Sequence, residues 1–262
     1  MGAPELMRPV ARGAARVLRD LRRCGGTHWR LRQLPVCTST ETELVRWLQR
    51  HPWSGDQPRA VFSSHQTQSH GQHGRVWLAP RGGVWLSAAL PWPHPISATG
   101  LFGLVVALAL TEQLESQAVP VRIKWPNDLL VHSRKLAGIL PTLVFRGSQV
   151  RQARVGVGLN VCNAVPSGAI ALKQLLPRSR CRLGFWQGAV LQALDRSTDL
   201  AHDPAYVVRE VERRLWSHHV RDPSSGDSWQ VRGLGLDGRL LLSQGTQTCS
   251  WTRWGDSNDR SV

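Results

Sequence analysis

Residues 124–140 constrain this chain more than any other stretch; their sequence is K-W-P-N-D-L-L-V-H-S-R-K-L-A-G-I-L. The alternating, β-branched residues 121–123 predict a strand that leads into it. Pro126 interrupts that strand because proline has no backbone donor and restricts the residue before it. Apolar residues then flank the polar segment 132–135, which predicts a hairpin with a four-residue tip.

The charges on this hairpin indicate an anionic ligand. Lys124 and Lys135 lie on or beside it together with one carboxylate, Asp128. Two cations near a single acid suit a phosphate better than any other common ligand. An ordinary hairpin with surface lysines is the alternative, but packing alone does not require these residue types in this order.

K-W-P-N-D followed by K-L-A-G-I-L resembles the signature of biotin–protein ligases, the enzymes that attach biotin to carboxylase carrier domains. Both halves are intact here at the expected spacing. The resemblance implies an α+β fold: a mixed sheet with flanking helices, similar to class II synthetases, and a small C-terminal SH3-like β-barrel. It implies ATP and biotin as substrates, Mg²⁺ as the metal, and a biotin carboxyl carrier protein as the partner.

The implied chemistry is the activation of biotin as biotinyl-5′-AMP and its transfer to a carrier lysine. The first step brings two anions together, so cations and a metal ion must offset their repulsion. We expect Lys135 to act on the reacting carboxylate and the α-phosphate, and Lys124 and Arg75 on the remaining phosphates. Asp128 is expected to hold Mg²⁺ or to orient a lysine.

A second motif of the resemblance lies at Ser39, Thr40 and Glu41, where the family has S-T-N in contact with the biotin head group. Glu41 stands in place of the asparagine, and an ionised carboxylate only accepts hydrogen bonds, whereas an amide also donates them. Any contact of Glu41 with the ligand must therefore differ from the usual one. Ser39 or Thr40 is equally suited to cap a helix that begins here.

The polar loop 65–77 resembles the family's glycine- and arginine-rich loop, which folds over biotin and the activated intermediate. The matching residues are Gln66, Gly71, Gly74, Arg75 and Trp77. Ser69 replaces a glycine, His70 replaces an arginine, and Gln72 stands where arginine is frequent. Histidine cannot form the bidentate fork of an arginine, so we expect weaker retention of the charged intermediate.

The run G-x-G-x-N at Gly156, Gly158 and Asn160 completes the resemblance. Glycine inside a strand indicates close approach of a ligand or of another backbone, and packing explains these two glycines equally well. The residues expected to bind biotin are Ser39, Thr40, Glu41, Gln66, His70, Gly71, Gln72, Lys135, Gly138 and Gly156. The residues expected to bind ATP or the adenylate are Arg75, Trp77, Lys124, Asn127 and Asn160.

The chain has 262 residues and a net charge of +15. The charge fits a basic surface without specific function, or attraction to ATP and an acidic carrier. Five cysteines without a C-x-x-C pair predict free thiols in a reducing compartment, hence the cytoplasm. The apolar run 100–110 is too short to span a membrane.

We expect three parts: a basic N-terminal extension (1–35), a catalytic domain that binds biotin and ATP (36–216), and a short SH3-like domain (217–262). The extension has a possible helix at 10–21, but it is too short for a winged helix-turn-helix. A monofunctional ligase is therefore expected, DNA binding is unlikely, and a homodimer is possible. The other predicted helices are 97–117, capped by Ser97, 183–200 and 206–216. The other predicted strands are 60–64, 84–90, 141–145, 154–161, 228–234 and 238–242.

Two rival functions stay open. A lipoate or octanoyl transferase shares the fold and the carrier lysine, although the intact K-W-P-N-D segment argues against it. The second rival is a catalytically degenerate basic protein that retains affinity for biotin or nucleic acid, and the altered loop at Ser69, His70 and Gln72 is its support. Substrate competition between biotin and lipoate would decide on the first rival, and release of pyrophosphate from biotin and ATP would separate the second.

Overall fold

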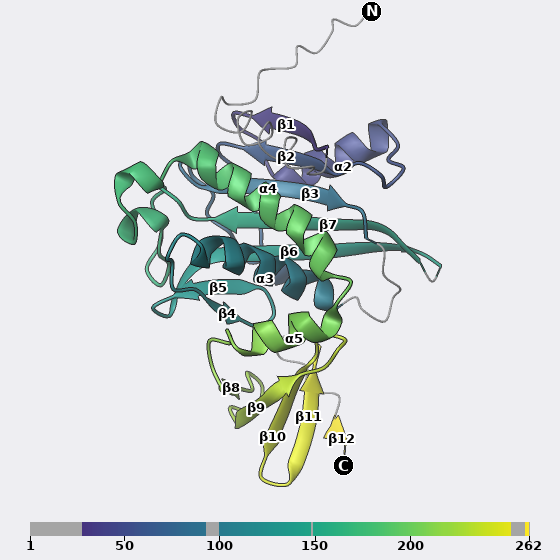
Figure 1. The fold of residues 1–262 in the computed structure, drawn as a ribbon, viewed down its shortest axis with the longest axis vertical. Helices are drawn as coiled ribbons and strands as arrows, with labels where there is room; N and C mark the ends of the chain where they lie inside the picture. Colours follow the sequence, from purple (N-terminus) through teal and green to yellow (C-terminus); the bar gives the residue numbers. More distant parts are fainter. Residues whose placement is uncertain (1–27, 93–99, 148, 253–259, 262) are drawn as a thin grey trace, which may run out of the picture.

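A computed structural model describes residues 28–92, 100–147, 149–252 and 260–261. The helix predicted at 10–21 and the cap predicted at Ser97 lie outside the described residues. The described strands form two separate sheets (Figure 1). Within the described residues, no helix combines the length and the apolar composition needed to cross a bilayer.

The larger sheet has seven strands in the order β1-β2-β3-β7-β6-β5-β4. Its strands are β1 (Arg30–Leu34), β2 (Arg59–Ser63), β3 (Val84–Leu90), β4 (Arg122–Lys124), β5 (Asp128–Val131), β6 (Arg134–Arg146) and β7 (Gln149–Leu159). β1 pairs with β2 in parallel and every other pairing is antiparallel, so the predicted mixed sheet is confirmed. β1 falls within the predicted extension 1–35 and forms an edge of this sheet.

Helices cover both faces of the larger sheet. They are α2 (Thr40–Arg50), α3 (Leu101–Glu115), α4 (Leu183–Leu200) and α5 (Pro204–Glu212). Short 3-10 turns lie at η1 (Gln72–Gly74), η3 (Leu172–Gln174) and η4 (Arg178–Arg180). A hydrophobic core lies on each face of the sheet, and successive residues of β2 point into different cores. Phe62 belongs to the core that contains α3, whereas Val61 belongs to the core that contains α2. Leu104 and Leu108 of α3 are almost fully buried, which explains why this helix is apolar on all sides.

The signature hairpin is tighter than predicted. His132 and Ser133 alone form its tip, with φ angles of 48° and 60°, while Arg134 and Lys135 already belong to β6. The predicted four-residue tip is therefore wrong, because a two-residue turn with positive φ angles matches the twist of the strands.

Strand β6 runs on from the hairpin to Arg146, so the continuation predicted at 141–145 is confirmed. Pro141 is tolerated inside it because the pairing with β5 ends at Gly138.

The helix predicted at 206–216 ends early, at Glu212. Its expected last turn instead runs beside β4, where Ile123 N donates to Arg214 O at 2.7 Å and Trp216 N donates to Ile123 O at 2.9 Å. Arg214 also joins α5 to α3, through ion pairs to Glu210 (2.7 Å) and Glu115 (3.0 Å).

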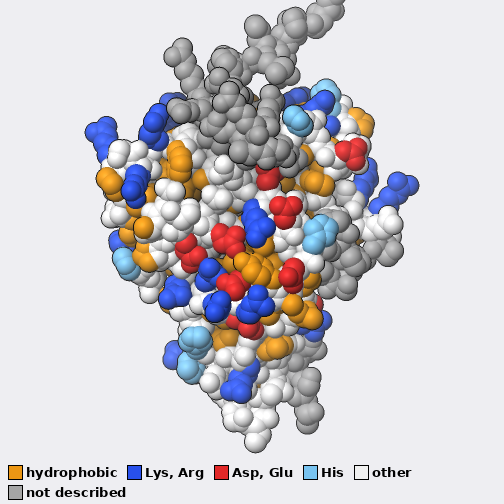
Figure 2. Space-filling model, viewed as in Figure 1, with side chains coloured by type: hydrophobic (Ala, Val, Ile, Leu, Met, Phe, Trp, Pro, Cys, Tyr) orange, Lys and Arg blue, Asp and Glu red, His pale blue; other side chains and the backbone are white. Residues whose placement is uncertain are grey.

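Acidic and basic side chains are intermixed on the face in Figure 2, so the positive charge there is not gathered into one patch.

The smaller sheet follows α5 and is antiparallel, in the order β12-β11-β10-β9-β8. Its strands are β8 (His219–Arg221), β9 (Ser228–Leu234), β10 (Leu240–Gln244), β11 (Gln247–Trp251) and β12 (Arg260–Ser261). Hydrogen bonds connect it to the rest of the protein: Trp125 Nε1, between β4 and β5, donates to Gly238 O (3.0 Å), and Leu234 N donates to Glu212 Oε1 of α5 (2.7 Å). The predicted C-terminal β-module is thus present as a small sheet.

Candidate active site

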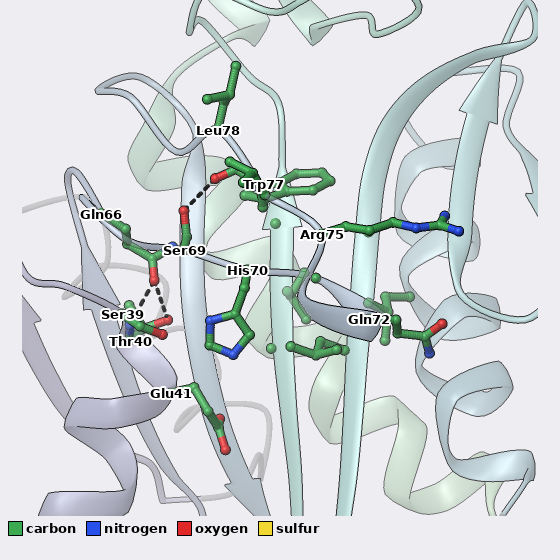
Figure 3. A pocket seen from close by; sticks show the side chains of 18 of the residues that line it. Ser39, Thr40, Glu41, Gln66, Ser69, His70, Gln72, Arg75, Trp77 and Leu78 are labelled. Carbon is green, nitrogen blue, oxygen red and sulfur yellow. Dashed lines mark hydrogen bonds between the residues drawn. The ribbon is translucent and has the colours of Figure 1, made fainter.

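A cavity of about 520 Å³ lies between the loop that joins β2 to β3 and the larger sheet, at strands β3, β7, β6 and β5 (Figure 3). The residues that line it come from the start of α2, from this loop and from these strands. Every residue predicted for biotin, ATP or catalysis lines the cavity except Lys124. The structure therefore brings segments that are distant in sequence to one site.

At one end of the cavity, the start of α2 is held by a polar network. Gln66 Oε1 accepts hydrogen bonds from Thr40 N (2.7 Å) and from Thr40 Oγ1 (3.1 Å), and Thr40 Oγ1 lies 2.9 Å from Ser87 Oγ (Figure 3). Ser39 is the N-cap residue by position, but its hydroxyl makes no capping bond to the helix. Thr40 and Gln66 are therefore preorganised, and the Ser39 hydroxyl is not used by α2.

Lys135 and Asp128 form an ion pair inside the cavity, with Lys135 Nζ 2.6 Å from Asp128 Oδ1. A register shift between Leu129 and Leu130 separates these two residues along the β5–β6 pairing. Such irregularities change the direction in which side chains of a strand point. Because the Lys135 side chain is 34% exposed, its ammonium is both oriented by Asp128 and accessible to a ligand.

Lys124 is paired with Asp128 across strands β4 and β5, but it is not among the residues that line the cavity. Its ammonium lies 5.6 Å from the centroid of the Trp216 ring. Its assignment to the ATP phosphates stays a prediction. Figure 3 shows the Arg75 side chain extending from the loop, and Arg75 does line the cavity.

The carboxylates of the cavity do not form a metal site of their own. Asp128 is paired with Lys135, and Glu41 is paired with Arg154. Across the described ranges, no three His, Cys, Asp or Glu residues are grouped as metal ligands. Mg²⁺ is commonly held by one or two carboxylates together with substrate phosphates and water. This donor set thus fits only a metal that arrives with the nucleotide, and Asp128 as a ligand stays a prediction.

The Trp77 ring lies against strands β6 and β7 at two glycines, Gly138 and Gly158. An added Cβ would lie 2.7 Å from the Trp77 ring at Gly158 and 3.1 Å from it at Gly138. At Gly156 the same atom would make ordinary contacts with Leu140 and Ser87, at 3.4 Å and 3.7 Å. Packing therefore explains Gly158, which must remain glycine for Trp77 to lie against β7.

The two asparagines of the site are fixed by main-chain and amide contacts. Asn127 Nδ2 donates to Ile139 O at 2.7 Å. Asn160 is 5% exposed, and its Oδ1 accepts a hydrogen bond from Asn163 Nδ2 at 2.9 Å. Their positions beside Lys135 are consequently set before any ligand binds.

The altered loop is closed on itself at its base. Ser69 Oγ donates to Trp77 O at 2.6 Å, and Trp77 N donates to Ser69 O at 3.1 Å. Gly71 N donates to Arg75 O at 2.8 Å. Serine at position 69 thus adds a hydrogen bond that glycine could not make, whereas His70 and Gln72 leave the loop with less fixed charge than arginines would.

Glu41 makes its main contact with a residue that the sequence reasoning missed. Its Oε1 lies 3.3 Å from Arg154 Nε on β7. Burial raises the pKa of Glu41, opposed by the charge of Arg154, a hydrogen bond from Ser87 and the charge of His70. Arg154 precedes Gly156 and Gly158 at two-residue spacing. That spacing puts all three on one face of the strand and could have revealed it.

Comparison with known proteins identifies the family. A family model described as the biotin/lipoate A/B protein ligase family matches residues 34–160. The biotin–[acetyl-CoA-carboxylase] ligase of Mycobacterium tuberculosis is 37% identical to this chain, over 87% of this chain and 80% of its own length. The bifunctional ligase/repressor of Bacillus subtilis is 36% identical over 38% of this chain and 32% of its own length.

The chain spans only 32% to 53% of the length of the first three curated relatives that it matches. Among solved structures, the biotin protein ligase from Aquifex aeolicus in complex with biotin and ATP has a TM-score of 0.64 at 21% identity. That match covers 88% of this chain and 97% of the Aquifex chain, and it shows a common fold. With the relative matched over four fifths of its length, these findings show that the chain belongs to the biotin protein ligase family.

Proposed function

We propose that this protein is an ATP-dependent ligase that activates biotin as biotinyl-5′-AMP and transfers the biotinyl group to a lysine of a biotin carboxyl carrier protein. One observation carries the proposal: the Lys135–Asp128 pair, Trp77 and the Thr40–Gln66 network line a single cavity. This supports a site in which the polar end of the cavity takes the biotin head group and the Lys135 ammonium meets the reacting carboxylate and phosphate.

In the first step, a carboxylate oxygen of biotin attacks the α-phosphorus of ATP. The new P–O bond gives the mixed anhydride, and the bond to the β-phosphate breaks to release pyrophosphate. Lys135 offsets the negative charge on the reacting carboxylate and the α-phosphate, while Asp128 keeps its ammonium in place. Arg75 and Lys124 are assigned to the other phosphates, and Asn127 and Asn160 to the nucleotide. Asp128 is the residue that would hold Mg²⁺, which would supply neutralisation of phosphate charge.

The biotin end is assigned to Ser39, Thr40 and Gln66. Their hydroxyl and amide groups supply the donors and acceptors that a cyclic urea requires. The chain beyond the ring runs past Gly156 and Gly138 toward Lys135. This direction brings the carboxylate of biotin to the ammonium, where the first step takes place.

In the second step, the ε-amine of the carrier lysine attacks the acyl carbon, an amide bond forms, and AMP leaves. Trp77 covers the anhydride and slows its hydrolysis by water.

We assign the β8–β12 sheet as the SH3-like module predicted at 217–262, and the catalytic domain as 36–216. The reaction takes place in the cytoplasm.

Pyrophosphate release tests this proposal. The protein is mixed with ATP and biotin, lipoate or octanoate, first alone and then with a carrier domain. We expect release with biotin only, a limited amount without carrier, and continuous turnover with carrier. Transfer of a lipoyl or octanoyl group to the carrier, without pyrophosphate release from biotin and ATP, would favour the transferase, and biotin binding without release would favour the degenerate protein.

A further inference from the structure

Two cysteines lie in contact at the two ends of one segment beside the cavity. The thiol of Cys162 donates a hydrogen bond to the main-chain oxygen of Cys181 at 3.1 Å. Cys162 follows the end of β7 and is exposed, whereas Cys181 lies just before α4 and is buried, and both are free thiols. The residues that join them, 163–180, are called the wall segment here.

The wall segment holds the main chain of Lys135 through both of its polar groups. Lys135 N donates to Gly168 O at 2.9 Å, and Ile170 N donates to Lys135 O at 3.0 Å. Pro166 and Ala169 of the same segment line the cavity. A covalent bond between the ends of the wall segment would therefore act on the residue whose ammonium is assigned to the reacting groups.

The two thiols differ in their access to an oxidant. Burial raises the pKa of Cys181, and the charge of Cys162 and a hydrogen bond between the two thiols raise it further. Cys181 is only 4% exposed, so it stays a neutral thiol out of reach of solvent. Cys162 is the accessible sulfur at which oxidation begins. An exposed cysteine beside a second, resolving thiol is typical of redox-sensitive pairs, and disulfides of reducing compartments are usually of this transient kind.

We propose that Cys162 and Cys181 are a reversible redox modification site, at which a peroxide converts the two thiols into a disulfide that ties down the wall segment. A cross-link removes open states of a segment and leaves its closed state. Formation of the disulfide does not depend on the proposed function. Its effect rests on that function, because a wall that opens less slows the exchange of ATP and AMP, and turnover falls.

The oxidation takes place in two steps. The Cys162 sulfur attacks one oxygen of hydrogen peroxide, the O–O bond breaks, and a sulfenic acid forms with release of water. The Cys181 sulfur then attacks the Cys162 sulfur, the S–S bond forms, the S–O bond breaks, and the hydroxyl group leaves with the thiol proton as a second water. The two sulfurs together give up two electrons, which the peroxide accepts. A small thiol restores both cysteines by thiol–disulfide exchange.

The test is mild oxidation of the folded full chain with hydrogen peroxide, followed by thiol blocking, digestion and mass spectrometry. We expect a peptide pair joined through Cys162 and Cys181 that dithiothreitol separates. Hydrogen exchange at the amides of Lys135 and Ile170 should slow about tenfold on oxidation. Turnover with biotin, ATP and a carrier domain should fall about fivefold and recover on reduction.

Cys162→Ser is the informative variant, because a serine hydroxyl can still donate to Cys181 O and the side chain is exposed. Its turnover should equal that of the reduced wild type and should not respond to peroxide. Cys249→Ser, on β11 of the smaller sheet, is the matched control and should respond as the wild type does.

Absence of the Cys162–Cys181 peptide pair, or an equal loss of turnover in Cys162→Ser, would overturn the proposal. A disulfide that forms but leaves hydrogen exchange and turnover unaltered would overturn its coupling to the cavity. Reduced protein that releases no pyrophosphate from biotin and ATP would overturn the proposed function instead, and the peptide pair would still report on the disulfide.

Discussion

Removal of the Lys135 ammonium should slow adenylation by about 10²-fold or more. Two unit charges 4 Å apart interact by about 4 kcal/mol at the effective dielectric constant near a protein surface. Asp128 lies 2.6 Å from the ammonium and neutralises part of its charge. We therefore expect a loss of about 3 kcal/mol in transition-state stabilisation, which corresponds to roughly 10²-fold and is typical of one preorganised charge-stabilising group.

The assay for Lys135→Ala is single-turnover release of pyrophosphate from ATP and biotin without a carrier, so that only the first step is observed. Lys173→Ala is the control, because the Lys173 ammonium donates to Cys162 O at 3.0 Å and lies outside the cavity lining. The control should stay close to the wild-type rate. Pyrophosphate release by Lys135→Ala at a near wild-type rate would refute the assignment of Lys135 to the reacting groups.

Three further changes have defined outcomes. Arg214→Met should lower the free energy of unfolding by about 2 kcal/mol in urea at pH 7. Hydrogen bonds from Arg214 lower the pKa of Glu210. The difference in the free energy of unfolding between wild type and variant should therefore shrink as the pH falls below about 4, and a difference that stays constant with pH would contradict this. Gly158→Ala should weaken adenylate binding about tenfold or more by displacing Trp77, a loss of about 1.4 kcal/mol; unchanged affinity in calorimetry would count against the packing argument. Gln72→Arg should slow escape of biotinyl-5′-AMP about tenfold through a charge-assisted hydrogen bond, and an unaltered lifetime of the bound intermediate would oppose this.

The sequence predicted those elements best whose pattern is local and continuous. The predicted strands at 84–90 and 228–234 and the helix at 183–200 coincide with β3, β9 and α4. Each is a run of apolar or alternating residues between clear breaks, so few competing assignments exist. The hairpin tip and the end of α5 were predicted less well, because pairing with neighbouring strands decided both.

The candidate site was predicted from motifs, and the structure brings nearly all of its residues together. Lys124 is the exception, since a linear motif does not show that its ammonium lies beside Trp216. Arg154 was missed because its two-residue spacing from Gly156 and Gly158 shows which face of the strand it occupies but not which side chain it contacts. Its pairing with Glu41 depends on the register of β7 against β3, which places Arg154 opposite Ala89, a residue distant in the sequence.

The central claim is that the cavity under the loop holds biotinyl-5′-AMP with its acyl phosphate at Lys135. A crystal structure with a non-hydrolysable biotinyl-adenylate analogue tests this directly. We predict that the analogue's linkage lies within hydrogen-bond distance of Lys135 Nζ, with its ring system against Thr40 and Gln66 and with Trp77 above the chain. An analogue bound elsewhere, or bound here with its linkage away from Lys135, would contradict the account.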